Sequence, residues 1–199
     1  MASPFFRLFG ATCLASALGV FSATKADAAD VIFPAPAPAA EIPTAGPSLN
    51  EIRLGVMYHD PSGPEESVDI NGEVLFDVGW NFALFGAPAY LRPAIGGTVN
   101  TEGYTSQAYA QIALTVDVTK HIFVEGTFGG MVHNGEDDSP SNEDLDLGCS
   151  TLFRESASIG FRVTERLNVM ATISHASNAG LCDKNDGLTN YGARVGYNF

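Results

Sequence analysis

The feature that most constrains this chain is an alternation of apolar and polar residues that runs from Glu51 to the last residue. Successive side chains of a β-strand point to opposite faces, so this pattern predicts strands rather than helices. Turn residues divide it into eight runs, and none is long and apolar enough for a membrane-spanning helix. The runs lie near residues 51–59, 66–78, 89–100, 104–117, 121–133, 149–163, 167–177 and 189–199.

The alternation also assigns two faces to each strand. One face carries the aliphatic and aromatic residues, and the other carries charges, amides and glycines. This is typical of a barrel with an apolar band facing lipid and a narrow polar lumen. We therefore predict an all-β fold, an eight-stranded antiparallel transmembrane β-barrel of the outer-membrane type; a soluble lipocalin-like barrel is the alternative. The chain ends in Tyr-Asn-Phe, which resembles the C-terminal signature of outer-membrane barrels.

The N-terminus predicts export. Arg7 precedes an apolar stretch from Leu8 to about Ser22, and Ala26-Asp27-Ala28 follows as a small-x-small cleavage site. A buried core helix is the alternative explanation for the apolar stretch. We expect a signal peptide over residues 1–28, a Pro/Ala-rich extended lead-in over 29–50, and a barrel over 51–199 located in the bacterial outer membrane.

Charge excludes one class of partner. The chain has 23 acidic and 10 basic residues, a net charge of −13, and phosphate contacts need Lys and Arg, so we expect no nucleic-acid binding. The acidic run from Glu136 to Asp146 is interpreted as a solvated loop, with cation binding as the alternative. The spacing of the histidines does not indicate a metal site, and we expect no cofactor.

Loop lengths predict which strand ends share a side of the membrane. Thr119-Lys120 and Thr164–Arg166 are short enough for periplasmic turns, whereas residues 134–148 and 179–188 are long, as outer loops are. Cys149 and Cys182 remain after signal cleavage and both fall at the outer end. An exported chain with two cysteines suits one disulfide.

The segment from Ser174 to Gly180 holds the candidate site. His175 and Ser177 are two residues apart in a strand, so they project from the same face, which their apolar neighbours assign to lipid. A His beside a Ser can act as general base for nucleophilic attack on an ester. The alternative is a polar rim at the membrane interface.

This segment resembles the PagL-type lipid A 3-O-deacylase (acyloxyacyl hydrolase) family, whose barrels carry His-x-Ser-Asn at the outer end of the seventh strand. His175, Ser177 and Asn178 match that motif, and Asn185 and Gly187 match the Asn-x-Gly that follows it. The resemblance implies hydrolysis of the ester-linked 3-hydroxyacyl chain of lipid A in the outer leaflet. Ser177 would be the nucleophile, His175 the base and Asn178 a contributor to oxyanion stabilisation.

One position departs from the family pattern. The acidic residue that orients the histidine falls two positions after the glycine, and here that position is Thr189. If the 164–166 turn is tight and pairs Val163 with Leu167, Glu155 lies directly opposite His175. We therefore hypothesise that Glu155 replaces the missing acid. Asp183 and Asp186 are the other candidates, and a plain interfacial carboxylate is the alternative role for Glu155.

Two functions follow from these patterns. The first is a carboxylic ester hydrolase that acts on lipid A in lipopolysaccharide. The second is a non-enzymatic structural or surface-recognition barrel, which Thr189 favours. The sequence leaves the oligomeric state open, with a homodimer as one alternative.

Overall fold

A computed structural model describes residues 48–141 and 143–199. The expected signal peptide, residues 1–28, and all but the last three residues of the expected lead-in lie outside this range. Residues 48–50 already belong to the first strand, which therefore begins three residues earlier than Glu51. Within the described residues, no helix is long and apolar enough to cross a membrane.

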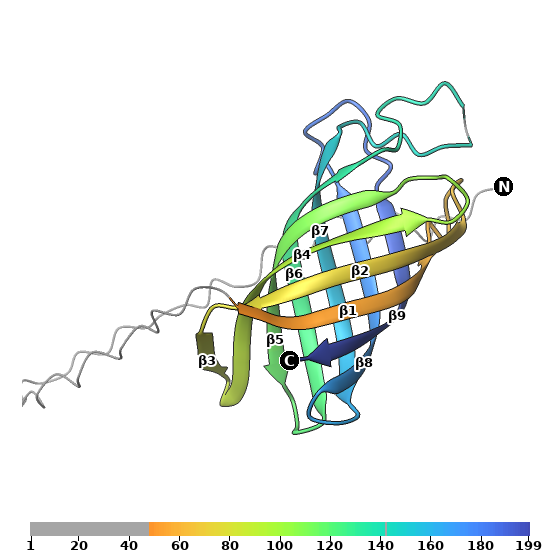
Figure 1. The fold of residues 1–199 in the computed structure, drawn as a ribbon. Helices are drawn as coiled ribbons and strands as arrows, with labels where there is room; N and C mark the ends of the chain where they lie inside the picture. The colour runs from red at the N-terminus through yellow and green to blue at the C-terminus, as the bar shows by residue number, and fades with distance from the viewer. Residues whose placement is uncertain (1–47, 142) are drawn as a thin grey trace, which may run out of the picture. The chain divides into compact units, whose positions relative to one another are not determined.

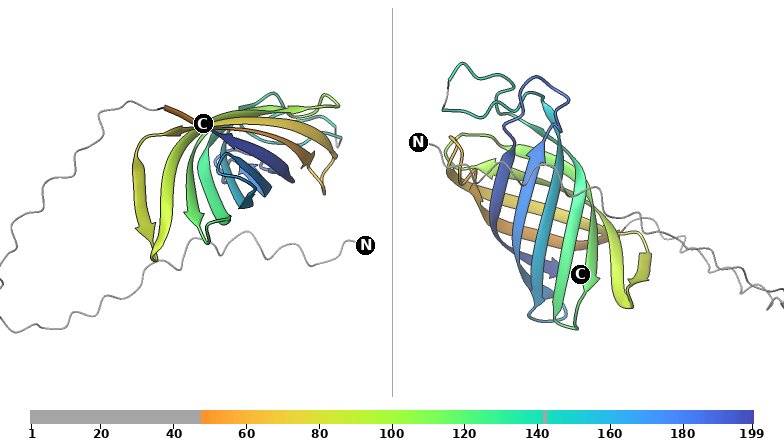
Figure 2. Two further views of the ribbon diagram at one scale, coloured as in Figure 1. Left: turned by 60° about the horizontal axis from the view of Figure 1, so that its bottom comes forward. Right: turned by 180° about the vertical axis from the view of Figure 1, so that it is seen from behind.

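The strands form a closed antiparallel barrel. They follow the order β2-β1-β9-β8-β7-β6-β5-β4-β3, and a further pairing of β2 with β4 closes a ring of eight strands (Figures 1 and 2). The predicted eight-stranded antiparallel barrel is confirmed. The described strands are β1 (Ser48–His59), β2 (Ser67–Asp77), β3 (Trp80–Leu84), β4 (Ala87–Asn100), β5 (Gln107–Asp117), β6 (Ile122–His133), β7 (Thr151–Arg162), β8 (Leu167–Ser177) and β9 (Leu188–Asn198).

Strand β3 was not predicted, because residues 79–88 fall between two of the eight predicted runs. Pairing of β2 with β4 ends at Leu75 opposite Ala94, and β3 then pairs with the first part of β4. The hairpin closes through Phe85 and Gly86, whose φ angles of 52° and 85° are both positive. A two-residue turn with two positive φ angles matches the twist of a hairpin. Residues 79–88 therefore contain a strand, β3, that pairs with β4 beyond the end of its pairing with β2.

The two barrel ends differ in the length of their connections. Tight turns join β5 to β6 and β7 to β8 at the turn end, at the bottom of Figure 1. The long connections between β6 and β7 and between β8 and β9 lie together at the opposite end, the loop end. This is the distribution predicted from the loop lengths.

The faces of the strands are those that the alternation predicts. Large apolar side chains point outward, and Leu54, for example, is 64% exposed. The adjacent Arg53 is 0% exposed and points into the lumen. The soluble-barrel alternative is wrong, because the lumen is lined with polar and charged residues.

An ion network centred on Arg53 fills the middle of the lumen. The Arg53 guanidinium donates to Glu51 at 2.9 Å, Glu73 at 3.0 Å and Glu125 at 2.6 Å. Arg194 donates to the same oxygen of Glu73 at 3.0 Å. These residues come from β1, β2, β6 and β9, so the network joins strands on different sides of the barrel.

Replacing Arg53 tests how much this network stabilises the fold. Arg53→Met should lower the free energy of unfolding by about 3–5 kcal/mol, because it leaves buried carboxylates without their shared partner. Urea unfolding in lipid vesicles, followed by the fluorescence of Trp80, the single tryptophan, would measure the change. Lys120→Met, in an exposed turn, is the matched control. Equal stability of the two variants would contradict the central role of Arg53.

Candidate active site

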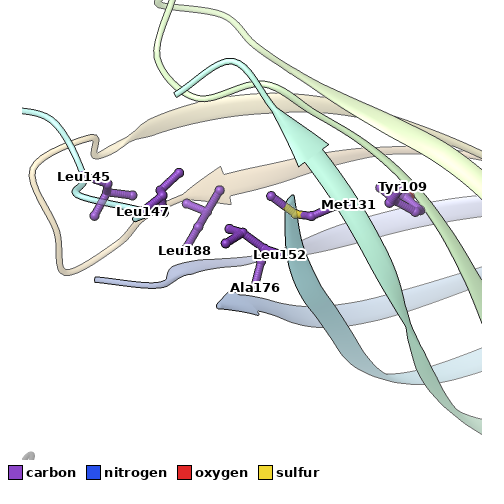
Figure 3. Packing of buried hydrophobic residues seen from close by; sticks show 7 residues of the cluster. All are labelled: Tyr109, Met131, Leu145, Leu147, Leu152, Ala176 and Leu188. Carbon is purple, nitrogen blue, oxygen red and sulfur yellow. The ribbon is translucent and has the colours of Figure 1, made fainter. Parts of the chain in front are cut away.

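Apolar side chains close the barrel under the long loops. Leu145 and Leu147, from the β6–β7 loop, fold back onto the inward-facing strand residues Leu152, Ala176 and Leu188 (Figure 3). Both loop leucines are at most 3% exposed. Burial of this apolar surface anchors the β6–β7 loop in the barrel mouth.

Glu65 links three connections at the loop end. This buried carboxylate, in the β1–β2 loop, accepts from the backbone N–H of Thr105 at 3.0 Å and of Leu145 at 3.1 Å. It also contacts His59 Nε2 at 3.2 Å. Burial alone would raise the pKa of Glu65, but these hydrogen bonds outweigh it and lower the pKa to about 2.

The two residues expected to carry the chemistry project outward from the loop end of β8. His175 and Ser177 are half-buried, and Ala176 between them faces the barrel interior. The outward face of β8 below them carries apolar residues such as Ile173 and Val169. The strand therefore presents a His and a Ser at the upper end of an apolar stripe.

His175 is oriented by strand β9. Its Nδ1 lies 2.9 Å from Thr189 Oγ1, and the two residues are cross-strand partners. Gly187, with a φ of 72°, packs against the edge of the ring: a Cβ at this position would lie 2.9 Å from His175 Cε1. Only glycine fits this close approach with that backbone conformation. The hydroxyl and the glycine together define the ring's position.

Glu155 lies where the register argument put it. It is the direct cross-strand partner of His175 on β7, and its side chain points outward and is exposed. The hydrogen bond of His175 goes to Thr189, on the opposite side of β8. Asp186, another candidate acid, is bonded to Asp146 of the β6–β7 loop, whose N–H donates to its carboxylate at 2.9 Å.

Asn178 follows Ser177 but points the other way. Its side chain is 2% exposed inside the loop end, and its Nδ2 donates to the backbone carbonyls of Leu147 and Lys184. Its backbone N–H donates to Asn185 Oδ1 at 2.9 Å. Asn178 thus lies beside His175 and Ser177 in sequence, and its polar atoms contact the loops.

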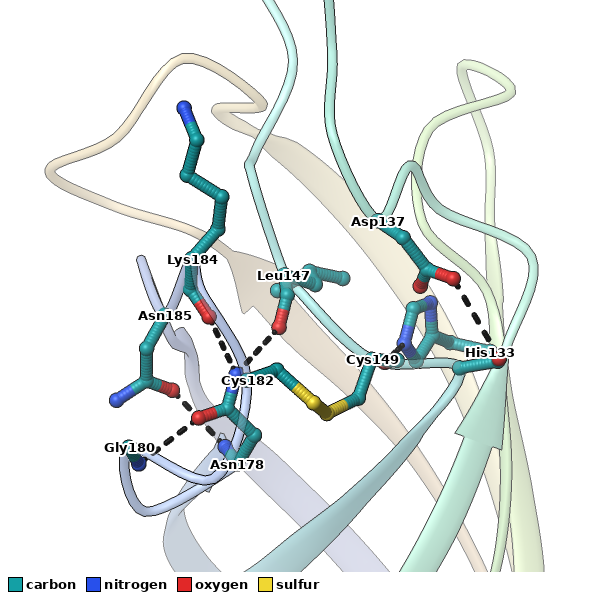
Figure 4. Close-up of a disulfide and its surroundings, with 10 residues drawn as sticks. His133, Asp137, Leu147, Cys149, Asn178, Gly180, Cys182, Lys184 and Asn185 are labelled. Carbon is teal, nitrogen blue, oxygen red and sulfur yellow. Dashed lines mark hydrogen bonds between the residues drawn. A yellow bond between two sulfur atoms is a disulfide. The ribbon is translucent and has the colours of Figure 1, made fainter.

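A disulfide between Cys149 and Cys182 joins the same two loops, with a Cα–Cα distance of 6.1 Å (Figure 4). The predicted pairing is confirmed. Among residues 48–141 and 143–199, no group of three His, Cys, Asp or Glu side chains is arranged to hold a metal ion.

Comparison with known proteins identifies the relationship. The sequence profile of the lipid A 3-O-deacylase (PagL) family matches residues 110–198. From β5 onward, this chain is PagL-like. The matched region contains Glu155, His175, Ser177 and Thr189, and the resemblance predicted from the motif is confirmed. A comparison with curated protein sequences found no match.

Solved structures establish the fold independently. The crystal structure of the outer membrane enzyme PagL superposes with a TM-score of 0.60 at 17% identity, covering 75% of this chain and 99% of PagL. A de novo designed transmembrane β-barrel gives a TM-score of 0.50 at 14% identity, covering 78% of this chain and 98% of the design. The barrel fold and the PagL match indicate an outer-membrane location.

The depressed pKa of Glu65 generates a prediction for the loop end. A carboxylate whose pKa falls from 4.5 to about 2 on folding contributes stability above pH 4.5, and this stability is lost as the pH falls toward 2. Wild-type loops should therefore resist pepsin at pH 4.5 and become cleavable as the pH approaches 2. Glu65→Gln should be cleaved readily across this range.

The adjacent Glu66 is exposed, so Glu66→Gln provides the matched control and should behave as wild type. Identical cleavage of the Glu65 and Glu66 variants at every pH would exclude Glu65 as the link between the loops.

Proposed function

We propose that this protein is an outer-membrane ester hydrolase that removes the 3-hydroxyacyl chain from lipid A of lipopolysaccharide. The observation that carries the proposal is the position of His175 and Ser177. They project from the outer wall of a PagL-like barrel at its loop end, inside the region that matches the family. An ester in the surrounding leaflet would reach them laterally, without entering the lumen.

The proposed chemistry is acyl transfer to Ser177. His175 Nε2 removes the hydroxyl proton as Ser177 Oγ attacks the ester carbonyl carbon, and His175 then returns this proton to the departing sugar oxygen. The products of this half-reaction are the sugar hydroxyl and an acyl-serine. Water, activated by His175 in the same way, releases the fatty acid and restores Ser177. This reaction requires the neutral tautomer of His175 that carries its proton on Nδ1, and this N–H then donates to Thr189 Oγ1.

Glu155 is the proposed source of negative charge for His175. A neutral threonine hydroxyl can orient the ring, but it stabilises an imidazolium less than a carboxylate does. Directly opposed Cβ atoms in antiparallel strands lie ~4.5–5.5 Å apart, so Glu155 is close enough to act on His175 through its charge. At a membrane surface, where the local dielectric constant is below that of water, such an interaction is strengthened.

A non-enzymatic barrel is the second candidate function, and a specific contact favours it. Thr189 occupies the position beside His175 Nδ1 where the family pattern has an acid. A barrel that had lost the reaction would keep the fold, the loops and the disulfide while losing that carboxylate. Activity measurements distinguish the two candidates.

The first activity test is mass spectrometry of lipid A from cells that produce the protein. Wild type should remove one 3-hydroxyacyl mass from a large fraction of the lipid A, and Ser177→Ala should remove none, because the variant lacks the attacking oxygen. Ser174→Ala is the matched control, since Ser174 lies on the same strand but faces the lumen. Unmodified lipid A with folded wild-type protein would favour the non-enzymatic barrel.

A pair of variants tests which residue supports His175. Glu155→Gln should lower kcat by about tenfold, because it removes the neighbouring charge without changing the side chain's size. Thr189→Glu should raise kcat by about tenfold, because a charged acceptor at Nδ1 is stronger by roughly 1–1.5 kcal/mol than a neutral one. Release of 3-hydroxy fatty acid from purified lipid A in micelles would be measured.

Full activity in Glu155→Gln would remove Glu155 from the mechanism. An increase in Thr189→Glu alone would then indicate that the wild-type enzyme works with a neutral partner for His175.

A further inference from the structure

We propose that Asn178 is a positioning residue, which joins the β6–β7 and β8–β9 loops and thereby holds Gly187 and Thr189 against His175. This role replaces the one expected from the motif, a hydrogen bond to the oxyanion. The inference rests on the proposed function, because it concerns the activity of the same site.

The direction of the Asn178 side chain separates it from the reacting atoms. Ser177 faces outward, and Asn178 is buried on the inner side. A carboxamide has two N–H donors, and both are used here, one on the carbonyl of Leu147 at 2.9 Å and one on the carbonyl of Lys184 (Figure 4). Its Oδ1 accepts from Gly180 N–H at 2.8 Å. No side-chain donor of Asn178 remains for an oxyanion.

The β6–β7 loop gives Asn178 a fixed support. Leu147 is 1% exposed in the apolar cluster of the barrel mouth, so its carbonyl is held in place. Gly148, with a φ of 77°, follows it, and a Cβ there would overlap the Lys184 carbonyl and lie 2.8 Å from Asn178 Nδ2. The two loops therefore meet backbone to backbone at this glycine.

A short stretch of chain, residues 184–189, connects the contacts of Asn178 to those of His175. Asn178 binds the carbonyl of Lys184 and, through its backbone N–H, the side chain of Asn185. Two residues later Gly187 packs on the imidazole, and Thr189 bonds to Nδ1. Loosening this stretch would release both groups that orient the ring. A small displacement of a general base can cost about 10²-fold in rate.

Gly148→Ala tests the proposal through the β6–β7 loop, which takes no part in the proposed reaction. The methyl group should push Lys184 away from Asn178, so kcat should fall by about 10²-fold, while KM changes little because the outer wall is unaltered. Thr189→Val, which removes the hydrogen bond to Nδ1 directly, should likewise lower kcat with little change in KM.

Asn178→Leu provides a second variant in case Gly148→Ala does not fold. It is close in size and uncharged, and it removes the donors to the carbonyls of Leu147 and Lys184. It should reproduce the loss in kcat, and its loss and that of Thr189→Val should not add in the double variant, because both act on the orientation of His175. A direct oxyanion role predicts that the two losses add, and no effect of Gly148→Ala.

Gly103→Ala is the matched control, because Gly103 also has a positive φ, of 94°, but lies in another loop with open space around it. It should retain wild-type kcat and KM. Wild-type kcat in Gly148→Ala, or additive losses in the double variant of Asn178→Leu and Thr189→Val, would overturn the positioning role. Failure of the proposed function would instead appear as an inactive wild type.

Discussion

The ion network around Arg53 is the constraint on which the rest of the barrel depends. Arg53, Glu73 and Glu125 are fully buried and come from three strands. A shift of any one strand by a single residue would move its charged side chain to the lipid face, at a high cost in free energy. The network therefore fixes strand register around the ring. Arg194 of β9, which bonds to Glu73, also bonds to Thr172 of β8 and Ser158 of β7, so the three strands that carry the candidate site are joined to the network.

Fixed register is what aligns the candidate site. Glu155, His175 and Thr189 stand in one row across β7, β8 and β9, each directly opposite its neighbour. Their side chains point outward because their immediate neighbours in sequence point into the barrel, and successive side chains of a strand alternate between the two faces. Strand register alone does not position the β8–β9 loop. The apolar cluster of the barrel mouth, the Cys149–Cys182 disulfide and the Asn178 hydrogen bonds hold this loop against the end of β8.

Much of this arrangement could be predicted from the sequence, because alternation and turn length determine it. They gave the strands, their faces, the disulfide's place and the pairing of Glu155 with His175. The inward direction of the Asn178 side chain could also be predicted, because Asn178 follows the outward-facing Ser177. The contact of Gly187 with the imidazole could not be predicted, because it depends on a loop conformation that no periodicity encodes. Strand β3 was missed because a break separates it from β2.

The nature of the His175 partner determines what the site can do. A hydroxyl at Nδ1 fixes the ring as well as a carboxylate would, but it adds little stabilisation when the imidazole becomes charged. Under the proposed function, negative charge would come from a residue that is not bonded to the ring, and Glu155 lies opposite it. In water such an interaction would be weak. At the boundary of a membrane it is stronger, because the Coulomb energy varies inversely with the dielectric constant. The outward placement of the candidate site, which under the proposed function would give lateral access to a lipid, is thus also what would allow an unbonded carboxylate to substitute for the missing acid.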